Sequence, residues 1–366
     1  MELTDIRPYI ALTLTNGVGT VLARNLIAHC GSAEAVFNEK KAVLLKVPGV
    51  GRAVADALLG KESFSRADAE IHFMQKRAVS GIHFLNPAFP RRLKHCPDAP
   101  LLLYYKGTAS LNPKRALAIV GTRKATSYGR QITETLIEGL QGTDILVVSG
   151  LAYGIDVIAH RACVKYGIET IGVTAHGHDQ IYPPAHAGIA VRMMEHGGVI
   201  TEFPSRTKPD KQNFPKRNRI VAGMVDALVV VETTVDGGAV ITSTLANGYN
   251  RDVFAFPGNV LSPFSQGCNQ LIRTNRAALV ENVQDILSAM QWDADKEKEA
   301  RQSSLFIALS DAEKAVMELL AEKGELLVDD IAGLLGFTQS KLAGVLLNLE
   351  LQGLLISMPG KKYAAG

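Results

Sequence analysis

The sequence predicts an α/β protein in which an extended Rossmann-like parallel sheet is flanked by an N-terminal helical domain and a C-terminal winged-helix domain. Between residues 85 and 290, short β-branched runs alternate with helical stretches, the pattern of parallel strands joined by crossover helices. Runs such as ILVVS and ALVVVE are continuously apolar, which suits strands covered on both faces. On either side of this region, apolar residues recur at helical spacing instead.

Residues 1–80 are expected to form a helical SAM-like domain around two similar turns. Gly17-Val18-Gly19 and Gly49-Val50-Gly51 lie 32 positions apart, and a helical pattern follows each. The pair resembles helix-hairpin-helix motifs, in which backbone N–H groups of the turn hold a phosphate. The alternative is that the glycines only make tight turns between packed helices, since charge in this region is nearly balanced.

The central domain is assigned to residues 85–290 and contains six predicted strands. Each is a short apolar or β-branched run of the kind that favours a strand. They are Ala116–Val120, Ile145–Ser149, Thr170–Thr174, Gly198–Glu202, Ala227–Glu232 and Val253–Phe256.

Residues 291–308 are polar and charged, and are predicted to be a linker. Residues 309–366 are then expected to form the winged helix, with a hairpin that turns at Pro359-Gly360. Its third helix, near 339–352, contains no Arg, and the domain holds five Lys/Arg against eight Asp/Glu. Because a DNA-reading helix carries base-contacting side chains, our hypothesis is that this domain makes protein contacts or binds duplex DNA weakly.

Composition is ordinary for a globular protein, with 47% hydrophobic residues, 20% charged residues and a net charge of +3. The positive charge gathers in residues 85–290, which hold 21 Lys/Arg against 16 Asp/Glu, so a polyanion is expected to bind there. The four cysteines form no CxxC pair, which argues against zinc and disulfides. Without a signal peptide or an apolar stretch of about 18 residues, a cytoplasmic protein with no membrane contact is expected.

The turns after the predicted strands are rich in glycine and hydroxyl residues. Gly121 and Thr122 follow the first strand, Gly150 follows the second, and Gly237-Gly238 follow the fifth. In open parallel sheets ligands bind at the carboxyl ends of the strands, where helix starts expose N–H groups that attract anions. These turns therefore predict an anion site.

A basic arm, Arg206 to Arg219, indicates which anion binds. It contains six cations, a single opposing Asp and the aromatic Phe214, which suits single-stranded nucleic acid because phosphates meet cations while a base stacks on the ring. The alternative is a solvated basic loop. Within the arm, Arg217 is expected to reach phosphate, whereas Arg219 is either a packed, ion-paired residue or a binding residue.

Together, the motifs IVGTRKATSYG, SGLAYGID, HGHDQIYP, TEFP, NFPKRNRIVAG, FPGN and GCNQLIR resemble the DNA-processing protein DprA (Smf) family over about residues 85–275. The resemblance implies an extended Rossmann fold that binds single-stranded DNA, forms dimers and hands incoming DNA to the recombinase RecA during natural transformation. It places the family's DNA-contacting positions on Arg123, Lys211, Phe214 and the Gly237-Gly238 loop. The chain departs from the family at Asp236-Gly237-Gly238, which is more often Ser-Gly-Ser, and at Thr274-Asn275-Arg276, which replaces a Gly-Ala pair.

The complete predicted DNA-binding set joins the turns, the basic arm and the family positions. Its members are Gly121, Thr122, Arg123, Lys124, Ser149, Gly150, Lys211, Phe214, Lys216, Arg217, Gly237 and Gly238.

No catalytic residue, cofactor or metal is predicted, because the sequence lacks G-x-G-x-x-G, Walker A, H-E-x-x-H and G-x-S-x-G motifs. His176 and His178 have no third ligand at defined spacing, so plain hydrogen bonding is favoured over a metal. The alternative function is a Rossmann-like nucleotide phosphoribohydrolase, whose P-G-G-x-G-T-x-x-E signature ends in a catalytic Glu. Here the corresponding loop, Asp236 to Thr242, is followed by no Glu until Glu281.

Overall fold

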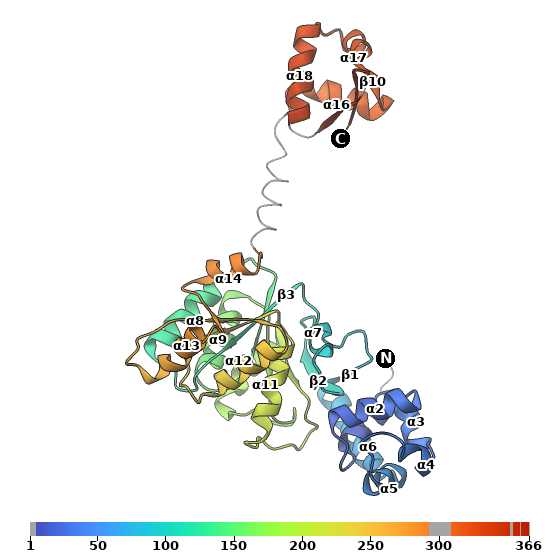
Figure 1. Cartoon of the computed structure of the whole chain (residues 1–366), viewed down its shortest axis with the longest axis vertical. Helices are drawn as coiled ribbons and strands as arrows, with labels where there is room; N and C mark the ends of the chain where they lie inside the picture. Colours follow the sequence, from blue (N-terminus) through green and yellow to red (C-terminus); the bar gives the residue numbers. More distant parts are fainter. Residues whose placement is uncertain (1–4, 293–308, 352–353, 359, 366) are drawn as a thin grey trace. The chain divides into compact units, whose positions relative to one another are not determined.

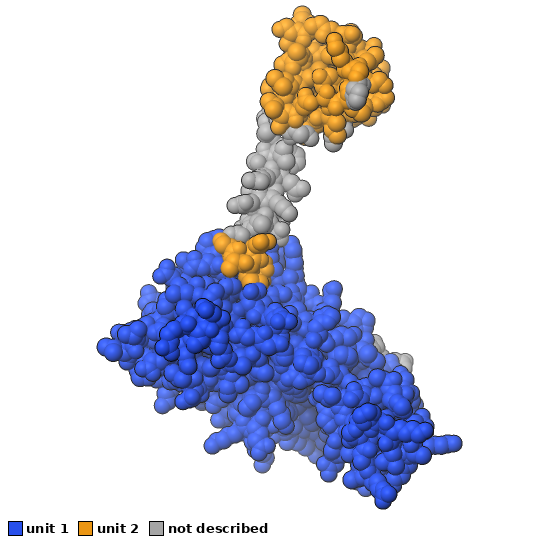
Figure 2. Space-filling model, viewed as in Figure 1, with its two compact units in different colours: residues 1–286 blue, residues 287–366 orange. Residues whose placement is uncertain are grey.

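The computed structural model describes residues 5–292, 309–351, 354–358 and 360–365. The chain divides into two compact units, Met1–Ile286 and Leu287–Gly366, which Figure 2 colours separately. Most of the predicted linker, residues 293–308, lies outside the described residues, as does Pro359 of the predicted wing turn.

The N-terminal part of the first unit is helical (Figure 1). Its helices are α1 (Arg7–Leu14), α2 (Thr20–Cys30), α3 (Ala33–Asn38), α4 (Lys41–Leu44), α5 (Arg52–Gly60) and α6 (Ser63–Arg77). The two glycine turns precede α2 and α5, and they pack against each other's helices. A Cβ on Gly17 would lie 2.9 Å from Val54 of α5, and one on Gly49 would lie 3.4 Å from Leu22 of α2. Each turn therefore takes part in one shared core.

A nine-stranded sheet forms the rest of the unit, in the order β1-β2-β6-β5-β4-β3-β7-β8-β9. The strands from β6 to β9 in this order run parallel, while β1 and β2 add an antiparallel edge. The bounds are β1 (Ser80–His83), β2 (Leu102–Gly107), β3 (Arg115–Val120), β4 (Ile145–Ser149), β5 (Thr170–Val173), β6 (Gly197–Thr201), β7 (Ala227–Val230), β8 (Asp252–Ala255) and β9 (Ala278–Leu279).

The six predicted strands are β3 to β8, so the predicted parallel sheet is confirmed. The sequence reading missed β1, β2 and β9. β1 and β9 are short, and neither has a fully buried run: β1 (SGIH) contains one buried residue and both residues of β9 are exposed. β2 (LLYYKG) is mostly buried but pairs antiparallel, so it lies outside the strand–helix alternation that identified the others.

Helices cover both faces of this sheet. Each face of the sheet has its own hydrophobic core, and neighbouring residues of one strand contribute to different cores because successive side chains point to opposite faces. Val199 of β6 packs with Ile189 and Met193, whereas Ile200 joins the cluster that contains Ile220 and Ala246. The helices are α8 (Ser127–Gly139), α9 (Ile155–Tyr166), α10 (Ala187–Glu195), α11 (Asn213–Gly223), α12 (Gly238–Gly248), α13 (Pro263–Arg273) and α14 (Val283–Ala289).

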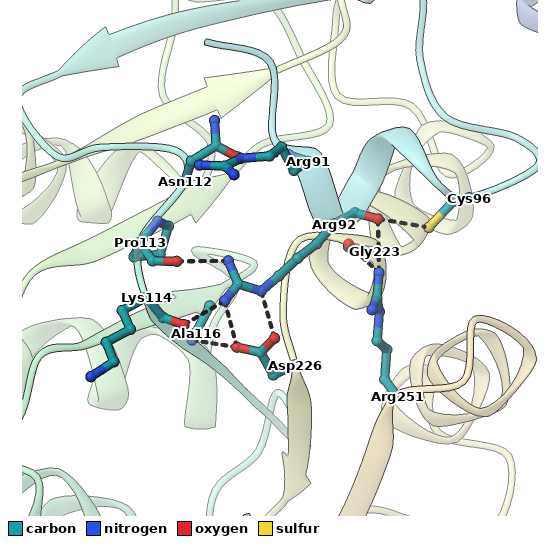
Figure 3. A network of polar contacts seen from close by, with 10 residues as sticks. All are labelled: Arg91, Arg92, Cys96, Asn112, Pro113, Lys114, Ala116, Gly223, Asp226 and Arg251. Atoms are coloured by element: carbon teal, nitrogen blue, oxygen red, sulfur yellow. Dashed lines mark hydrogen bonds and ion pairs between the residues drawn. The ribbon is translucent and has the colours of Figure 1, made fainter. Parts of the chain in front are cut away.

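The amino-terminal ends of β3 and β7 are tied together by a polar network around Asp226 (Figure 3). The Asp226 carboxylate accepts hydrogen bonds from Arg92 Nε at 2.6 Å and Nη2 at 2.8 Å, and from the Ala116 N–H at 2.9 Å. Arg92 lies in α7 (Arg91–Lys94) and also donates to the carbonyls of Pro113 and Lys114. These bonds fix the end of the sheet that is opposite to the glycine-rich turns.

The second unit contains α16 (Asp311–Lys323), α17 (Val328–Leu335) and α18 (Gln339–Leu351), with a small sheet in the order β10-β12-β11. Its strands are β10 (Leu326–Leu327), β11 (Leu355–Met358) and β12 (Lys362–Ala365). Leu342, Leu346 and Leu349 bury one side of α18, but its other side exposes Leu347 at 56% and Leu351 at 78%. The helix in the recognition position thus exposes a mixture of apolar and polar side chains, with Lys341 as its single cation.

Within the described residues, no helix combines the length and the apolar character needed to cross a membrane.

We expect Asp226→Ala to lower the free energy of unfolding by about 2 kcal/mol, because it removes the carboxylate that accepts from Arg92 Nε and from the Ala116 N–H. Urea denaturation followed by circular dichroism measures this change. Asp68→Ala is the control, since Asp68 and its partner Arg7 are 53% and 42% exposed and such pairs contribute less than about 1 kcal/mol. Equal losses in the two variants would contradict the role assigned to Asp226.

Candidate nucleic-acid interface

A cleft of about 390 Å³ opens at the carboxyl ends of β3 and β7, where the strand order reverses. Ligand sites of open α/β sheets lie at such switch points. Three segments that are distant in sequence meet there: the turn after β3, the basic arm and the loop after β7. Among the residues lining the cleft are Gly121, Thr122, Arg123, Gly150, Lys211, Phe214, Arg217, Gly237 and Gly238.

The turn after β3 is shaped by the buried carboxylate of Glu232, which follows β7. Glu232 accepts hydrogen bonds from the Thr126 N–H at 3.0 Å and from the Thr126 hydroxyl at 2.6 Å. Its backbone carbonyl accepts the Thr122 N–H at 2.7 Å. Gly129 leaves room for this carboxylate, since a Cβ there would lie 2.0 Å from Glu232 Oε2. Glu232 thus holds the turn that carries Arg123.

Sequence reasoning did not identify Glu232 as a site residue. The available signal was a carboxylate at the end of a continuously apolar strand, VVVE. A charged group is buried there only when it is paired or hydrogen-bonded, and the Thr126 backbone and hydroxyl meet that requirement.

A second close approach fixes the same turn from the β4 side. Gly154 has φ 77°, and a Cβ on it would lie 2.1 Å from the Thr122 carbonyl oxygen. The Ile155 N–H, at the start of α9, donates to that same carbonyl at 3.2 Å. The glycine is therefore required both by its left-handed conformation and by the contact.

The basic arm reaches the cleft through the first turn of α11. The Arg123 guanidinium carbon lies 4.8 Å from the centre of the Phe214 ring, a cation–π contact between the turn and the arm. Tyr182 lies on the same side, with its ring centre 6.4 Å from that of Phe214. The arm and the turn after β3 thus occupy the same edge of the sheet.

Two residues of the predicted set are buried instead of presented to a ligand. Arg217 is 4% exposed and its guanidinium donates to the carbonyls of Gly150 and of Val173, the latter at 2.6 Å. Ser149 is fully buried and donates to the Ile119 carbonyl at 2.6 Å. The expectation that Arg217 reaches phosphate is therefore corrected: its Nη1 attaches α11 to the ends of β4 and β5, and its Nε donates to Asn218 Oδ1 at 3.1 Å. Ser149 is corrected likewise, because its hydroxyl joins β4 to β3.

Other predicted cations lie outside the cleft lining. Lys124 and Lys216 are exposed at the surface, but neither is among the residues that line the cleft. For Arg219, the structure selects the structural alternative, because its side chain is 11% exposed and ion-paired with Glu202. Burial raises the pKa of Glu202, and the Arg219 charge opposes that rise.

Two groups of opposite charge, Arg217 and Asp156, are buried beneath the cleft. Burial lowers the pKa of Arg217 to about 10, which leaves the guanidinium charged at neutral pH. Asp156 at the start of α9 lies beside it, and burial raises the pKa of this carboxyl while the Arg217 charge opposes the rise. Gly150 covers both groups, since a Cβ there would lie 2.1 Å from Arg217 Nη1 and 2.5 Å from Asp156 Oδ2.

The histidines near the cleft make local hydrogen bonds. The His176 Nε2 accepts the Tyr182 N–H at 3.1 Å, and the His178 Nε2 lies 3.0 Å from the Tyr104 carbonyl oxygen. His160 lies four positions after Asp156 on α9, and burial lowers its pKa to about 3. Across the residues that the structure describes, no group of three His, Cys, Asp or Glu side chains is placed to hold a metal.

Comparison with known proteins identifies the family. The family model described as DNA recombination-mediator protein A matches residues 80–291, more than half of the chain. The chain belongs to the DNA-processing protein DprA (Smf) family. A further model of this family, the DprA winged helix domain, matches residues 299–361.

Relatives and solved structures agree with this assignment. The DNA processing protein DprA of Streptococcus pneumoniae is 38% identical over 208 residues, which are 57% of this chain and 73% of the relative. The X-ray structure of that protein superposes with a TM-score of 0.68 at 31% identity, covering 79% of this chain and 98% of the other. A Helicobacter pylori DprA structure, determined to explain how that protein binds single-stranded DNA, gives a TM-score of 0.54 at 27% identity, covering 59% and 96%.

We expect Gly150→Ala to lower the free energy of unfolding by about 1–3 kcal/mol, because the new methyl overlaps the buried Arg217 and Asp156 groups. Thermal denaturation measures the loss. Gly238→Ala is the matched control, since a Cβ at Gly238 has nothing within 4 Å. If both variants melted at the wild-type temperature, the tight cover over Arg217 would be disproved.

Proposed function

We propose that this chain binds single-stranded DNA in the cleft between β3 and β7, with little preference for base sequence and without catalysing a reaction. One observation carries the proposal: the Arg123 guanidinium lies over the Phe214 ring, so the cation-bearing turn and the basic arm line one cleft. Membership in the DprA family and the single-stranded DNA binding of the H. pylori relative support it.

Each part of the cleft has a separate task in this proposal. Arg123 and Lys211 meet phosphates, and the contact with Phe214 keeps Arg123 from extending into solvent. The Gly237-Gly238 turn opens α12 and lets the strand approach the helix N-terminus. Arg217, buried beside Asp156, attaches α11 beneath the cleft and so positions the arm. Phosphate contacts of this kind read no base, so sequence preference is small.

The enzyme alternative requires a catalytic Glu, and its signature loop does not supply one here. The loop that corresponds to the phosphoribohydrolase signature, Asp236 to Thr242, contains no Glu. Among the described residues, the carboxylate that lines the cleft is Asp156, which lies beneath Gly150 beside a buried guanidinium. We therefore propose binding without hydrolysis.

Two further parts of the proposal rest on family resemblance. Members of the family form dimers and deliver single-stranded DNA to the recombinase RecA, and we propose both for this chain, in a cytoplasmic role in natural transformation. A dimer places two clefts on one strand, which raises the apparent affinity through effective concentration.

We expect Arg123→Ala and Lys211→Ala to weaken the binding of single-stranded DNA about tenfold each, for every sequence tested. Each also lowers the slope of log K against log salt by about 0.7, because one phosphate contact is lost. Phe214→Ala weakens binding with less change in slope. Fluorescence anisotropy titrations at several salt concentrations measure both quantities.

Lys216→Ala is the matched control for Lys211→Ala, since Lys216 lies on the same arm outside the cleft lining. It should bind within about twofold of wild type. Wild-type affinity in all three cleft variants would rule out this site. Release of free base from nucleoside monophosphates would establish the hydrolase instead.

For the winged helix, we expect residues 309–366 alone to bind duplex DNA more weakly than 1 µM in physiological salt, because α18 exposes the apolar Leu347 and Leu351 and carries a single cation, Lys341, and no Arg. The segment has a core of its own around Leu342 and Leu346. A gel shift measures the affinity, and a submicromolar complex would contradict the hypothesis that this domain makes protein contacts.

A further inference from the structure

The basic arm begins directly after Ser205, and Ser205 is held by the N-terminal helical domain. The Glu70 carboxylate of α6 accepts the Ser205 N–H at 2.8 Å and the Ser205 hydroxyl at 2.6 Å. Arg66, one turn earlier on α6, donates to the Ser205 carbonyl at 2.5 Å and forms an ion pair with Glu70 at 2.7 Å. Every polar group of Ser205 therefore has a partner on a single helix of another domain.

This contact is buried, which distinguishes it from an ordinary surface ion pair. Glu70 is 1% exposed and Ser205 is 5% exposed. Hydrogen bonds to an ionised acceptor are short and about twice as strong as neutral ones, and burial protects them from salt. The anchor therefore persists under the same conditions that weaken phosphate contacts.

A second anchor holds the arm on its other side. The Asp179 carboxylate accepts the Arg206 N–H at 2.8 Å, and the Gly177 N–H donates to the Thr207 carbonyl at 3.1 Å. Between the two anchors, Arg206 takes a left-handed conformation with φ 67°. A non-glycine residue adopts such a conformation only where its surroundings hold it there.

The anchored start of the arm, Ser205 to Thr207, lies close to the cleft along the chain. Lys211 is five positions after Arg206 and Phe214 is eight positions after it. Displacing the start of the arm would therefore move side chains that line the cleft. We propose that Arg66 and Glu70 are positioning residues for DNA binding: through Ser205, the N-terminal domain fixes the direction in which the basic arm leaves the sheet. This inference rests on the proposed function. Arg66 and Glu70 do not line the cleft, so their effect on DNA affinity acts through the arm.

Two variants test the anchor, Glu70→Gln on the helix and Ser205→Ala on the arm, each in the full chain. We expect both to weaken the binding of an oligo-dT strand about fivefold, a typical size for coupling between sites. The salt slope stays at the wild-type value, because the number of phosphates contacted is unchanged. Trypsin cleavage after Lys211 becomes faster in both variants, and saturating oligo-dT suppresses it.

Asp68→Asn is the matched control, because Asp68 lies on α6 and pairs with Arg7, away from the arm. It should leave affinity and cleavage unchanged. If Glu70→Gln prevents folding, Arg66→Lys takes its place beside Ser205→Ala, because it keeps a positive charge next to Glu70 while removing the guanidinium that donates to the Ser205 carbonyl.

Wild-type affinity in both Glu70→Gln and Ser205→Ala would overturn the inference; Ser205→Ala alone removes the hydroxyl bond and keeps the backbone bonds to Glu70 and Arg66. An equal loss of affinity in Asp68→Asn and in these two variants would also overturn it. A reduced salt slope would overturn it as well, because the anchor would then act by direct contact with DNA. Failure of the proposed function is a different result: the wild-type chain would bind no oligo-dT, while the rate of arm cleavage would still report whether the anchor exists.

Discussion

The interface depends on the burial of one guanidinium. Arg217 inserts from α11 between the ends of β4 and β5 and donates to the carbonyls of Gly150 and Val173. Buried carbonyls at the ends of strands need hydrogen-bond donors, and the Arg217 guanidinium donates to two of them, which attaches the helix to the sheet at a defined height. With α11 attached in this way, Phe214 lies beside Arg123 and the basic arm passes the turn after β3. Without it, the arm would be an ordinary basic loop.

The cations of the central domain therefore divide into two classes that a charge count does not separate. The first class is paired with carboxylates and carbonyls within the protein and comprises Arg92, Arg217 and Arg219. Arg123 and Lys211 remain at the surface of the cleft and supply its accessible charge. Burial strengthens the hydrogen bonds and ion pairs of the first class, which stabilise the fold. The exposed cations of the second class interact with ligands in a salt-sensitive way.

Much of the fold follows from the sequence, because apolar runs and glycine turns are local features. The six strands from β3 to β8 and the turn with Arg123 were predicted from such runs. What could not be predicted depends on depth and on distant partners. Nothing in the RNR motif reveals that Arg217 lies beneath Gly150, and nothing near Ser149 reveals that its hydroxyl faces β3. Glu232 and Glu70 act on residues more than a hundred positions away, so no spacing rule identifies them.

The two glycine turns of the N-terminal domain have a consequence for how that domain opens. Because Gly17 faces Val54 and Gly49 faces Leu22, each turn completes the surroundings of the other's helix. Unfolding either turn would expose apolar side chains of both helices. Partial opening would therefore lose many contacts while gaining little conformational entropy. Residues 5–77 should accordingly exchange their slowest amide protons together, as one cooperative unit rather than helix by helix.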